Sequence, residues 1–178
     1  MPKQVVAFAA SSSSRSINKQ LVTYACGFLR EAQVEILDLN DYELPLFSVD
    51  REEELGQPPS ARAFLQKIAD ADGIIVSFAE HNGAYSAAYK NLYDWISRIQ
   101  PRVYQDKPMV LLSTSPGGRG GKSVMDLAQA QIPRFGGDIR GSFSLPSFEQ
   151  NFDAEAGRIS DPEQAAALET AVRSLFES

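Results

Sequence analysis

The sequence holds few of the side chains that supply reactive chemistry. Among its 178 residues are one cysteine, Cys26, and one histidine, His81. A single cysteine excludes an intramolecular disulfide and a metal centre built on cysteines. The lone histidine belongs to no cysteine–histidine or histidine–carboxylate constellation that would indicate nucleophilic or acid–base catalysis. We therefore expect no catalytic side chain and assign no metal ligand.

Long apolar runs and an excess of basic charge are also missing. No segment approaches the roughly 20 apolar residues of a membrane span, and the N-terminal run, MPKQVVAFAA, is too short for a signal peptide. The 17 Lys and Arg residues are outnumbered by 23 Asp and Glu residues, which gives a net charge of −6. Binding to nucleic acid needs a basic face. We expect a cytoplasmic protein that binds neither nucleic acid nor membrane.

The sequence does contain two alternating kinds of apolar segment, and no repeat or linker divides residues 1–178 into more than a single domain. Continuous apolar runs predict strands, and apolar residues spaced three and four apart predict helices. The predicted strands are residues 4–10, 34–39, 73–78, 108–114 and 138–145. The predicted helices are residues 17–30, 60–71, 84–99, 121–135, where Pro133 should kink or end the helix, and a last one opened by Asp161 and Pro162 with a capping box to Gln164. Residues 42–59 are expected to form a surface excursion.

This alternation predicts an α/β fold with a parallel sheet and helices on both faces. We expect a flavodoxin-like three-layer sandwich, with a five-stranded sheet in the order 2-1-3-4-5. Such sheets bind ligands beyond the carboxyl ends of their strands, where the strand order reverses, here between strands 1 and 3. The loops after the first, third and fourth strands are therefore the candidate ligand-binding segments.

The loop after the first strand is dense in hydrogen-bond donors. Residues 10–18 read Ala-Ser-Ser-Ser-Ser-Arg-Ser-Ile-Asn and lead into a helix whose first amides are unpaired. This combination predicts a site for a terminal phosphate, with a serine-rich capping turn as the alternative. The patterns GxxxxGK[ST] and GxGxxG are absent, which argues against a nucleoside triphosphate or a dinucleotide. The candidate phosphate-binding residues are Ser11, Ser13, Arg15, Ser16, Ile17 and Asn18.

The loops after the third and fourth strands are suited to lie against a flat ring. Residues 80–83 read Glu-His-Asn-Gly, where polar groups can bind a ring edge and the glycine permits a close approach. Residues 115–121 read Ser-Pro-Gly-Gly-Arg-Gly-Gly and expose bare backbone, with an ordinary flexible loop as the alternative. The candidate ring-binding residues are Glu80, His81, Asn82, Gly83, Ser115, Pro116, Gly117, Gly118 and Arg119.

These loops, with Lys90-Asn91 and Asp94-Trp95 on the following helix, resemble the NADPH-dependent FMN reductase family, which includes quinone, chromate and azo-dye reductases. The resemblance spans residues 4 to about 170. It implies that Ser11, Ser16 and Asn18, with neighbouring amides, bind the FMN phosphate. It further implies that residues 80–83 line the isoalloxazine ring and ribityl chain, while Ser115, Gly117 and Gly118 cover the other side of the flavin. The four helix residues would fix that helix and a subunit interface.

The sequence departs from the family pattern at three places. The family usually has Gly-Ser-x-Arg where this chain has Ala10-Ser11-Ser12-Ser13, so the phosphate arginine is missing and Arg15 is the expected substitute. The usual Pro-Glu-Tyr-Asn has Ala79 and His81 in place of its proline and tyrosine. Ser86 stands where a further proline is expected. These differences bear on FMN affinity and flavin potential more than on the fold.

The resemblance implies an FMN-dependent NAD(P)H oxidoreductase that works by ping-pong hydride transfer. NADPH or NADH would reduce the flavin, which would then reduce a quinone, a free flavin, a metal oxyanion or an azo compound. A flavodoxin-like electron carrier and a non-enzymatic flavin-binding sensor remain the alternatives. The loop of glycines without an aromatic residue favours the reductase, because it leaves one ring face open. Arg119 and Lys122 could favour the 2′-phosphate of NADPH or could simply be solvated.

The predicted helix over residues 84–99 carries more aromatic surface than one sheet face can cover. Tyr85, Tyr89, Tyr93 and Trp95 spread around its circumference. Excess aromatic surface of this kind often marks a protein interface. We therefore expect a homodimer or homotetramer, with complete internal packing of these rings as the alternative.

Overall fold

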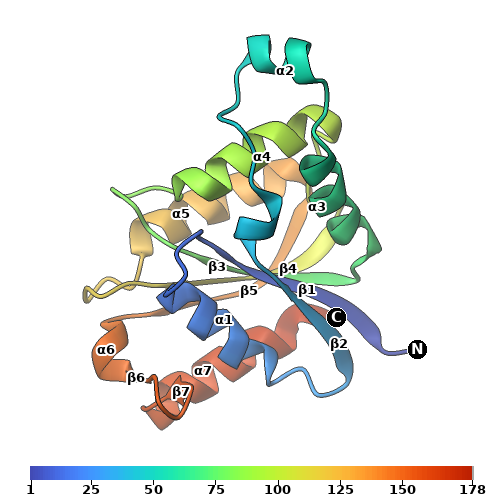
Figure 1. The fold of residues 1–178 in the computed structure, drawn as a ribbon. Helices are drawn as coiled ribbons and strands as arrows, with labels where there is room; N and C mark the ends of the chain where they lie inside the picture. The colour runs from blue at the N-terminus through green and yellow to red at the C-terminus, as the bar shows by residue number, and fades with distance from the viewer. Residues whose placement is uncertain (178) are drawn as a thin grey trace.

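The computed structural model describes residues 1–177 and is organised around a five-stranded sheet (Figure 1). Its strands are β1 (Lys3–Ala10), β2 (Ala32–Leu37), β3 (Gly73–Phe78), β4 (Lys107–Thr114) and β5 (Gly137–Leu145). All neighbours are parallel, and the order is β2-β1-β3-β4-β5, which confirms the prediction. Every residue of the central strand β3 is buried, because helices cover both of its faces.

The helices divide between the two faces and complete the predicted three-layer sandwich (Figure 1). One face is covered by α1 (Ile17–Cys26) and α7 (Pro162–Arg173), and the other by α3 (Pro59–Asp70), α4 (Ala87–Ile99) and α5 (Lys122–Gln131). Successive side chains of a strand point to opposite faces, so β1 contributes to both cores. Val5 and Ala7 pack with α1 and α7, whereas Val6 and Phe8 pack with the other three helices.

The segment between β2 and α3 is more ordered than the sequence predicts. The short helix α2 (Val49–Leu55) lies where only a surface excursion over residues 42–59 is expected, and a further short helix, η1 (Leu39–Tyr42), begins where the second strand is expected to end. α2 buries none of its residues, so it lacks the apolar periodicity that would have indicated a helix. Ser48 caps it by accepting a hydrogen bond from the amide of Arg51 at 3.1 Å. Figure 1 shows α2 projecting from the body of the molecule.

Several predicted boundaries shift. α1 ends at Cys26, and α4 begins only at Ala87. Pro133 does end the regular part of its helix, since the short helix η2 (Ile132–Phe135) replaces α5 there. Asp161 caps α7 by accepting from the amide of Glu163 at 3.1 Å, but the buried side-chain oxygen of Gln164 has no partner among the described residues. The predicted capping box is therefore wrong.

The remaining elements follow β5. They are α6 (Phe148–Asn151), the antiparallel pair β6 (Phe152–Asp153) and β7 (Arg158–Ile159), and the terminal η3 (Ser174–Phe176). Within residues 1–177, none of the helices has the length and apolarity that crossing a membrane requires.

Candidate functional site

The three candidate loops meet at one edge of the sheet. In the sheet register, Ala10 at the end of β1 lies beside Phe78 at the end of β3, which lies beside Ser113 of β4. The loops that follow these strands therefore begin side by side. This is the topological switch point at which flavodoxin-like sheets bind ligands.

The loop after β1 holds itself in shape and leaves several amides free. Ser11, a buried residue, accepts a hydrogen bond from the amide of Ser13 at 3.2 Å, and Ser16 caps α1 by accepting from the amide of Lys19 at 3.2 Å. In residues 1–177 no group accepts the backbone N–H of residues 14, 15, 17 or 18. These free amides at a helix N-terminus fit a phosphate group.

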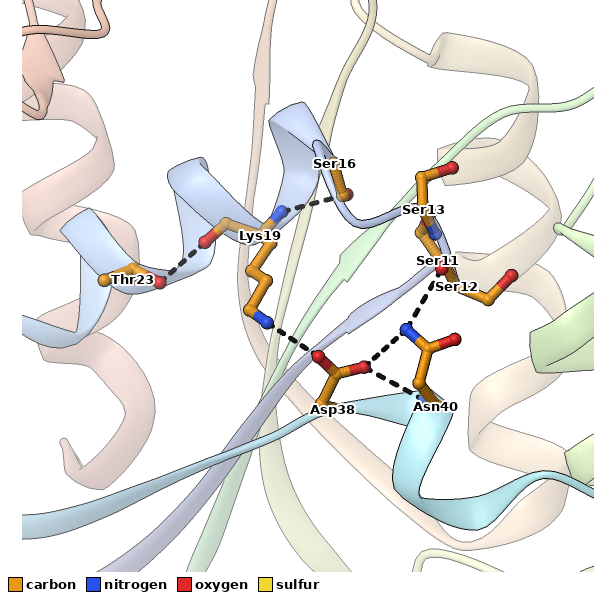
Figure 2. Close-up of polar contacts among 8 residues, drawn as sticks. All are labelled: Ser11, Ser12, Ser13, Ser16, Lys19, Thr23, Asp38 and Asn40. Carbon is orange, nitrogen blue, oxygen red and sulfur yellow. Dashed lines mark hydrogen bonds and ion pairs between the residues drawn. The ribbon is translucent and has the colours of Figure 1, made fainter.

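A charged network braces this loop from the side of β2 (Figure 2). The ammonium group of Lys19 lies 2.7 Å from the carboxylate of Asp38, and that hydrogen bond holds the pKa of Asp38 below its usual value. Asp38 also accepts from the amide of Asn40 at 2.9 Å, and the side chain of Asn40 donates to the carbonyl of Ser12 at 3.0 Å. Since Lys19 is already paired, the exposed Arg15 is the cation of this loop with no anionic partner in the described chain.

The loop after β3 is a tight turn. His81 and Ala84 exchange backbone hydrogen bonds at 3.0 and 3.1 Å, and the two residues between them have φ angles of 52° at Asn82 and 77° at Gly83. Two positive φ angles define a type I′ turn, which Asn-Gly adopts with little strain. His81, Asn82 and Gly83, which the sequence predicts to contact a ring, are all exposed.

Glu80 has a contact that the sequence does not indicate. Its carboxylate accepts a hydrogen bond at 2.8 Å from the amide of Val124, in the first turn of α5. The N-cap residue of α5 is Gly121, which has no side chain to cap the helix. Glu80 thus supplies the cap from another loop and ties the β3 loop to the β4 loop.

The glycines of the β4 loop separate into two pairs. Gly120 and Gly121 are buried with φ angles of 60° and 79°, and a Cβ on Gly120 would lie 2.9 Å from the backbone of Leu145. These two glycines serve the fold. Gly117 and Gly118 are exposed, and a Cβ on either would have no neighbour closer than 4.0 Å. Only this second pair offers open backbone to a ring.

The basic residues of the β4 loop differ in how they are compensated. Lys122 forms an ion pair with Asp126 at 2.8 Å on the next turn of α5. Arg119 is exposed and makes a single long contact, at 3.4 Å, to the hydroxyl of Ser123. Arg119 is therefore the better candidate of the two for a phosphate of the nicotinamide cofactor.

The side chain of Asn18, expected at the phosphate, and that of Ser86, which stands where the family has a proline, both bind other parts of the chain. The side chain of Asn18 is buried and bonded to Ser77 and Thr114, so its Oδ1 is fully occupied, while its backbone N–H is left for a ligand. Ser86, which replaces a proline, donates to the carbonyl of Ala10 at 2.7 Å and caps α4. Asn18 thus ties α1 to the ends of β3 and β4, and Ser86 ties the start of α4 to the end of β1.

The helix residues of the motif have mainly internal roles. Lys90 and Asp94 form an ion pair at 2.6 Å. The indole N–H of Trp95 donates to the carbonyl of Pro45 at 2.8 Å, and Asn91 binds the same backbone stretch. Asn91 and Trp95 therefore hold the chain leading into α2 against α4.

The aromatic face of α4 is largely satisfied within the chain. Trp95 and Tyr89 are 0% and 4% exposed, whereas Tyr85 and Tyr93 are half-buried. Burial raises the pKa of Tyr85 to about 12, and its hydroxyl donates to the side chain of Gln131 at 3.0 Å. The Tyr85 hydroxyl is thus neutral at physiological pH. Of the four rings, only those of Tyr85 and Tyr93 have exposed surface that an interface could cover.

Known proteins resemble this chain in sequence and in fold. The chain is 35% identical over 168 residues to an NADPH:quinone oxidoreductase of Arabidopsis thaliana, covering 89% of this chain and 83% of that protein. It is 34% identical over 121 residues to a 2-hydroxy-1,4-benzoquinone reductase of a Burkholderia species, covering 67% and 64% of the two chains. The flavoenzyme NAD(P)H:(acceptor) oxidoreductase of Paracoccus denitrificans superimposes with a TM-score of 0.77 at 22% identity over 97% and 94% of the chains, which shows the same fold.

The family model for NADPH-dependent FMN reductases matches residues 4–171. That range includes all three candidate loops and every strand of the main sheet except the first residue of β1. The match confirms the predicted FMN cofactor, the NAD(P)H donor and the oxidoreductase class. The chain belongs to the NADPH-dependent FMN reductase family.

Proposed function

We propose that this protein reduces quinones with electrons from NADPH, using FMN bound at the carboxyl edge of the sheet. The observation that carries the proposal is the meeting of three loops there, one with free amides and two with exposed backbone. The quinone reductases among its relatives indicate the class of acceptor. When bound, FMN supplies the chemistry of accepting a hydride from a reduced nicotinamide and passing two electrons to an acceptor.

The loop after β1 would hold the phosphate. The free N–H groups of residues 14, 15, 17 and 18 can donate to its oxygens, and the positive end of the α1 dipole favours its charge. The guanidinium group of Arg15 would add a charge-assisted hydrogen bond. The hydroxyls of Ser11 and Ser16 would support this arrangement by fixing the backbone, and Ser13 and Ile17 would contribute through their place in the turn.

The other two loops would hold the ring. The exposed backbone of Asn82 and Gly83 would bind its polar edge, and the stretch Ser115–Pro116–Gly117–Gly118 would lie along it. Because Gly117 and Gly118 carry no side chains, one face of the ring would stay open to a nicotinamide or a quinone. Glu80 is occupied as a helix cap, so the proton that quinone reduction consumes beside the hydride would come from solvent.

The absorption spectrum of the purified protein tests this proposal. We expect flavin absorption, which bleaches on addition of NADPH under nitrogen and returns on addition of a quinone. A sample that remains colourless after FMN is added would refute the assignment. A sample that binds FMN yet oxidises no NADPH would instead be an electron carrier.

We also propose that the protein forms a homodimer or homotetramer in the cytoplasm. Tyr85 and Tyr93 keep part of their surface exposed, and Leu46, Val49 and Leu55 are 77%, 58% and 52% exposed. The ion pair of Arg98 with Glu52, at 2.9 Å, places α2 beside α4, so these side chains could share one interface. Sedimentation tests the association, and cell fractionation tests the location.

A further inference from the structure

The side chain of Asn18 joins the phosphate loop to the ends of two strands. Asn18 is the second residue of α1 and is 2% exposed. Its Oδ1 accepts from the amide of Thr114 at 3.1 Å and from the hydroxyl of Ser77 at 2.8 Å, and its Nδ2 donates to the carbonyl of Thr114 at 3.3 Å. Both lone pairs of Oδ1 are therefore used by the protein itself.

The position of Thr114 explains why an amide is needed there. On one side Thr114 pairs with Leu145 of β5, but on the other side β3 ends at Phe78, opposite Ser113. A buried N–H and a buried C=O without partners would each cost the full desolvation of the group. A side-chain amide presents one acceptor and one donor, as a peptide group does, so Asn18 stands in for the missing strand residue. Alanine and leucine offer neither group, and aspartate lacks the donor.

This clamp connects the two ends of the proposed FMN site. The first amides of α1 would bind the phosphate, and residues 115–118, which directly follow Thr114, would lie along the ring. The ribityl chain fixes how far apart phosphate and ring can be, so the two loops must keep a matching distance. Resting on the proposed function, we infer that Asn18 is a positioning residue whose side chain sets this distance and is not itself a phosphate ligand.

Asn91 provides a matched control for this inference. Its side chain also binds only backbone, accepting from the amide of Phe47 at 2.8 Å and donating to the carbonyls of Leu44 at 3.3 Å and Pro45 at 3.1 Å. Asn18→Ala and Asn91→Ala thus remove the same chemical group from comparable clamps. Both variants should unfold at a lower temperature than the wild type, because each leaves backbone groups unpaired.

The decisive measurements are made on enzyme saturated with FMN. Asn18→Ala should change the visible circular dichroism of the bound flavin and lower kcat with NADPH and a quinone by about 10- to 100-fold, the loss expected of a misplacement near 1 Å. Asn91→Ala should leave both at wild-type values. Wild-type spectrum and kcat in the Asn18 variant, or an equal change in the Asn91 variant, would overturn the inference.

If the Asn18→Ala variant does not fold, Ser77→Ala tests the inference in its place. It removes one of the two donors to Oδ1 and should produce the same changes at a smaller size. A saturated Ser77→Ala enzyme with wild-type spectrum and kcat would then overturn the inference. Flavin binding by the wild type is measured first on the same preparation, and its failure would count against the proposed function rather than against Asn18.

Discussion

The carboxyl edge of the sheet and the segment from residue 43 to residue 58 are both built largely of loops, but they are held in different ways. At the edge, polar side chains such as Asn18, Glu80 and Ser86 form hydrogen bonds to the backbone of neighbouring strands and helices. In the segment, Asn91 and Trp95 hold the backbone of residues 44–47, but α2 buries none of its residues and Leu46 is 77% exposed. The edge is preorganised for a ligand, whereas the segment presents apolar surface that a second chain could cover.

The largest effect is expected from replacing one of the two buried glycines of the β4 loop. Gly120→Ala places a Cβ 2.9 Å from the backbone of Leu145 at a φ of 60°. We expect it to lower the free energy of unfolding by about 1–3 kcal/mol and to abolish FMN binding, because the whole β4 loop must shift. Thermal unfolding and fluorescence titration with FMN measure the two effects.

Gly118→Ala is the matched control, since its Cβ has no neighbour closer than 4.0 Å. It should keep the wild-type unfolding temperature and weaken FMN binding only a few-fold. Equal stability losses in the two variants would contradict the division of the glycines into a structural pair and a ligand pair.

Replacing Arg15 tests whether FMN binding needs a positive charge on the loop after β1. Arg15→Ala should weaken FMN binding by about 10-fold, the effect of losing one charge-assisted hydrogen bond, without changing stability. Affinity for riboflavin, which has no phosphate, should not change. Lys19→Ala is the comparison, because Lys19 is paired with Asp38 and should contribute less. A larger loss of FMN affinity in Lys19→Ala than in Arg15→Ala would show that Arg15 is not the cation that binds the phosphate.

Glu80 tests the link between the β3 and β4 loops. Glu80→Ala removes the cap of α5 and should cost about 1 kcal/mol of stability. Glu80→Gln keeps an acceptor oxygen and should cost less. Chemical denaturation of the flavin-free protein measures both, and a Gln variant as unstable as the Ala variant would show that the hydrogen bond to Val124 is not the source of the effect.

The edge also shows which parts of the site can be predicted from sequence. The strands and the positions of the three loops are predictable because buried parallel strands have continuous apolar runs and their carboxyl ends must meet. The destinations of individual side chains are not. Glu80 contacts a residue 44 positions away and Asn18 one 96 positions away, so no local pattern indicates either contact. α2 could not be predicted for a different reason. None of its residues is buried, so its sequence has no helical spacing of apolar residues.

The segment of residues 43–58 gives the smallest effect on stability and the sharpest contrast with the edge. Leu46→Ser should change the free energy of unfolding by less than about 0.5 kcal/mol, because the side chain is already 77% exposed. It should nevertheless weaken self-association, measured by sedimentation at micromolar concentration, if this segment is covered by another copy. Ile36→Ser, at a 38% exposed position on the edge strand β2, is the control and should leave association unchanged. A wild-type protein that sediments only as a monomer would remove the interface altogether, and the exposed leucine would then be an ordinary apolar surface residue.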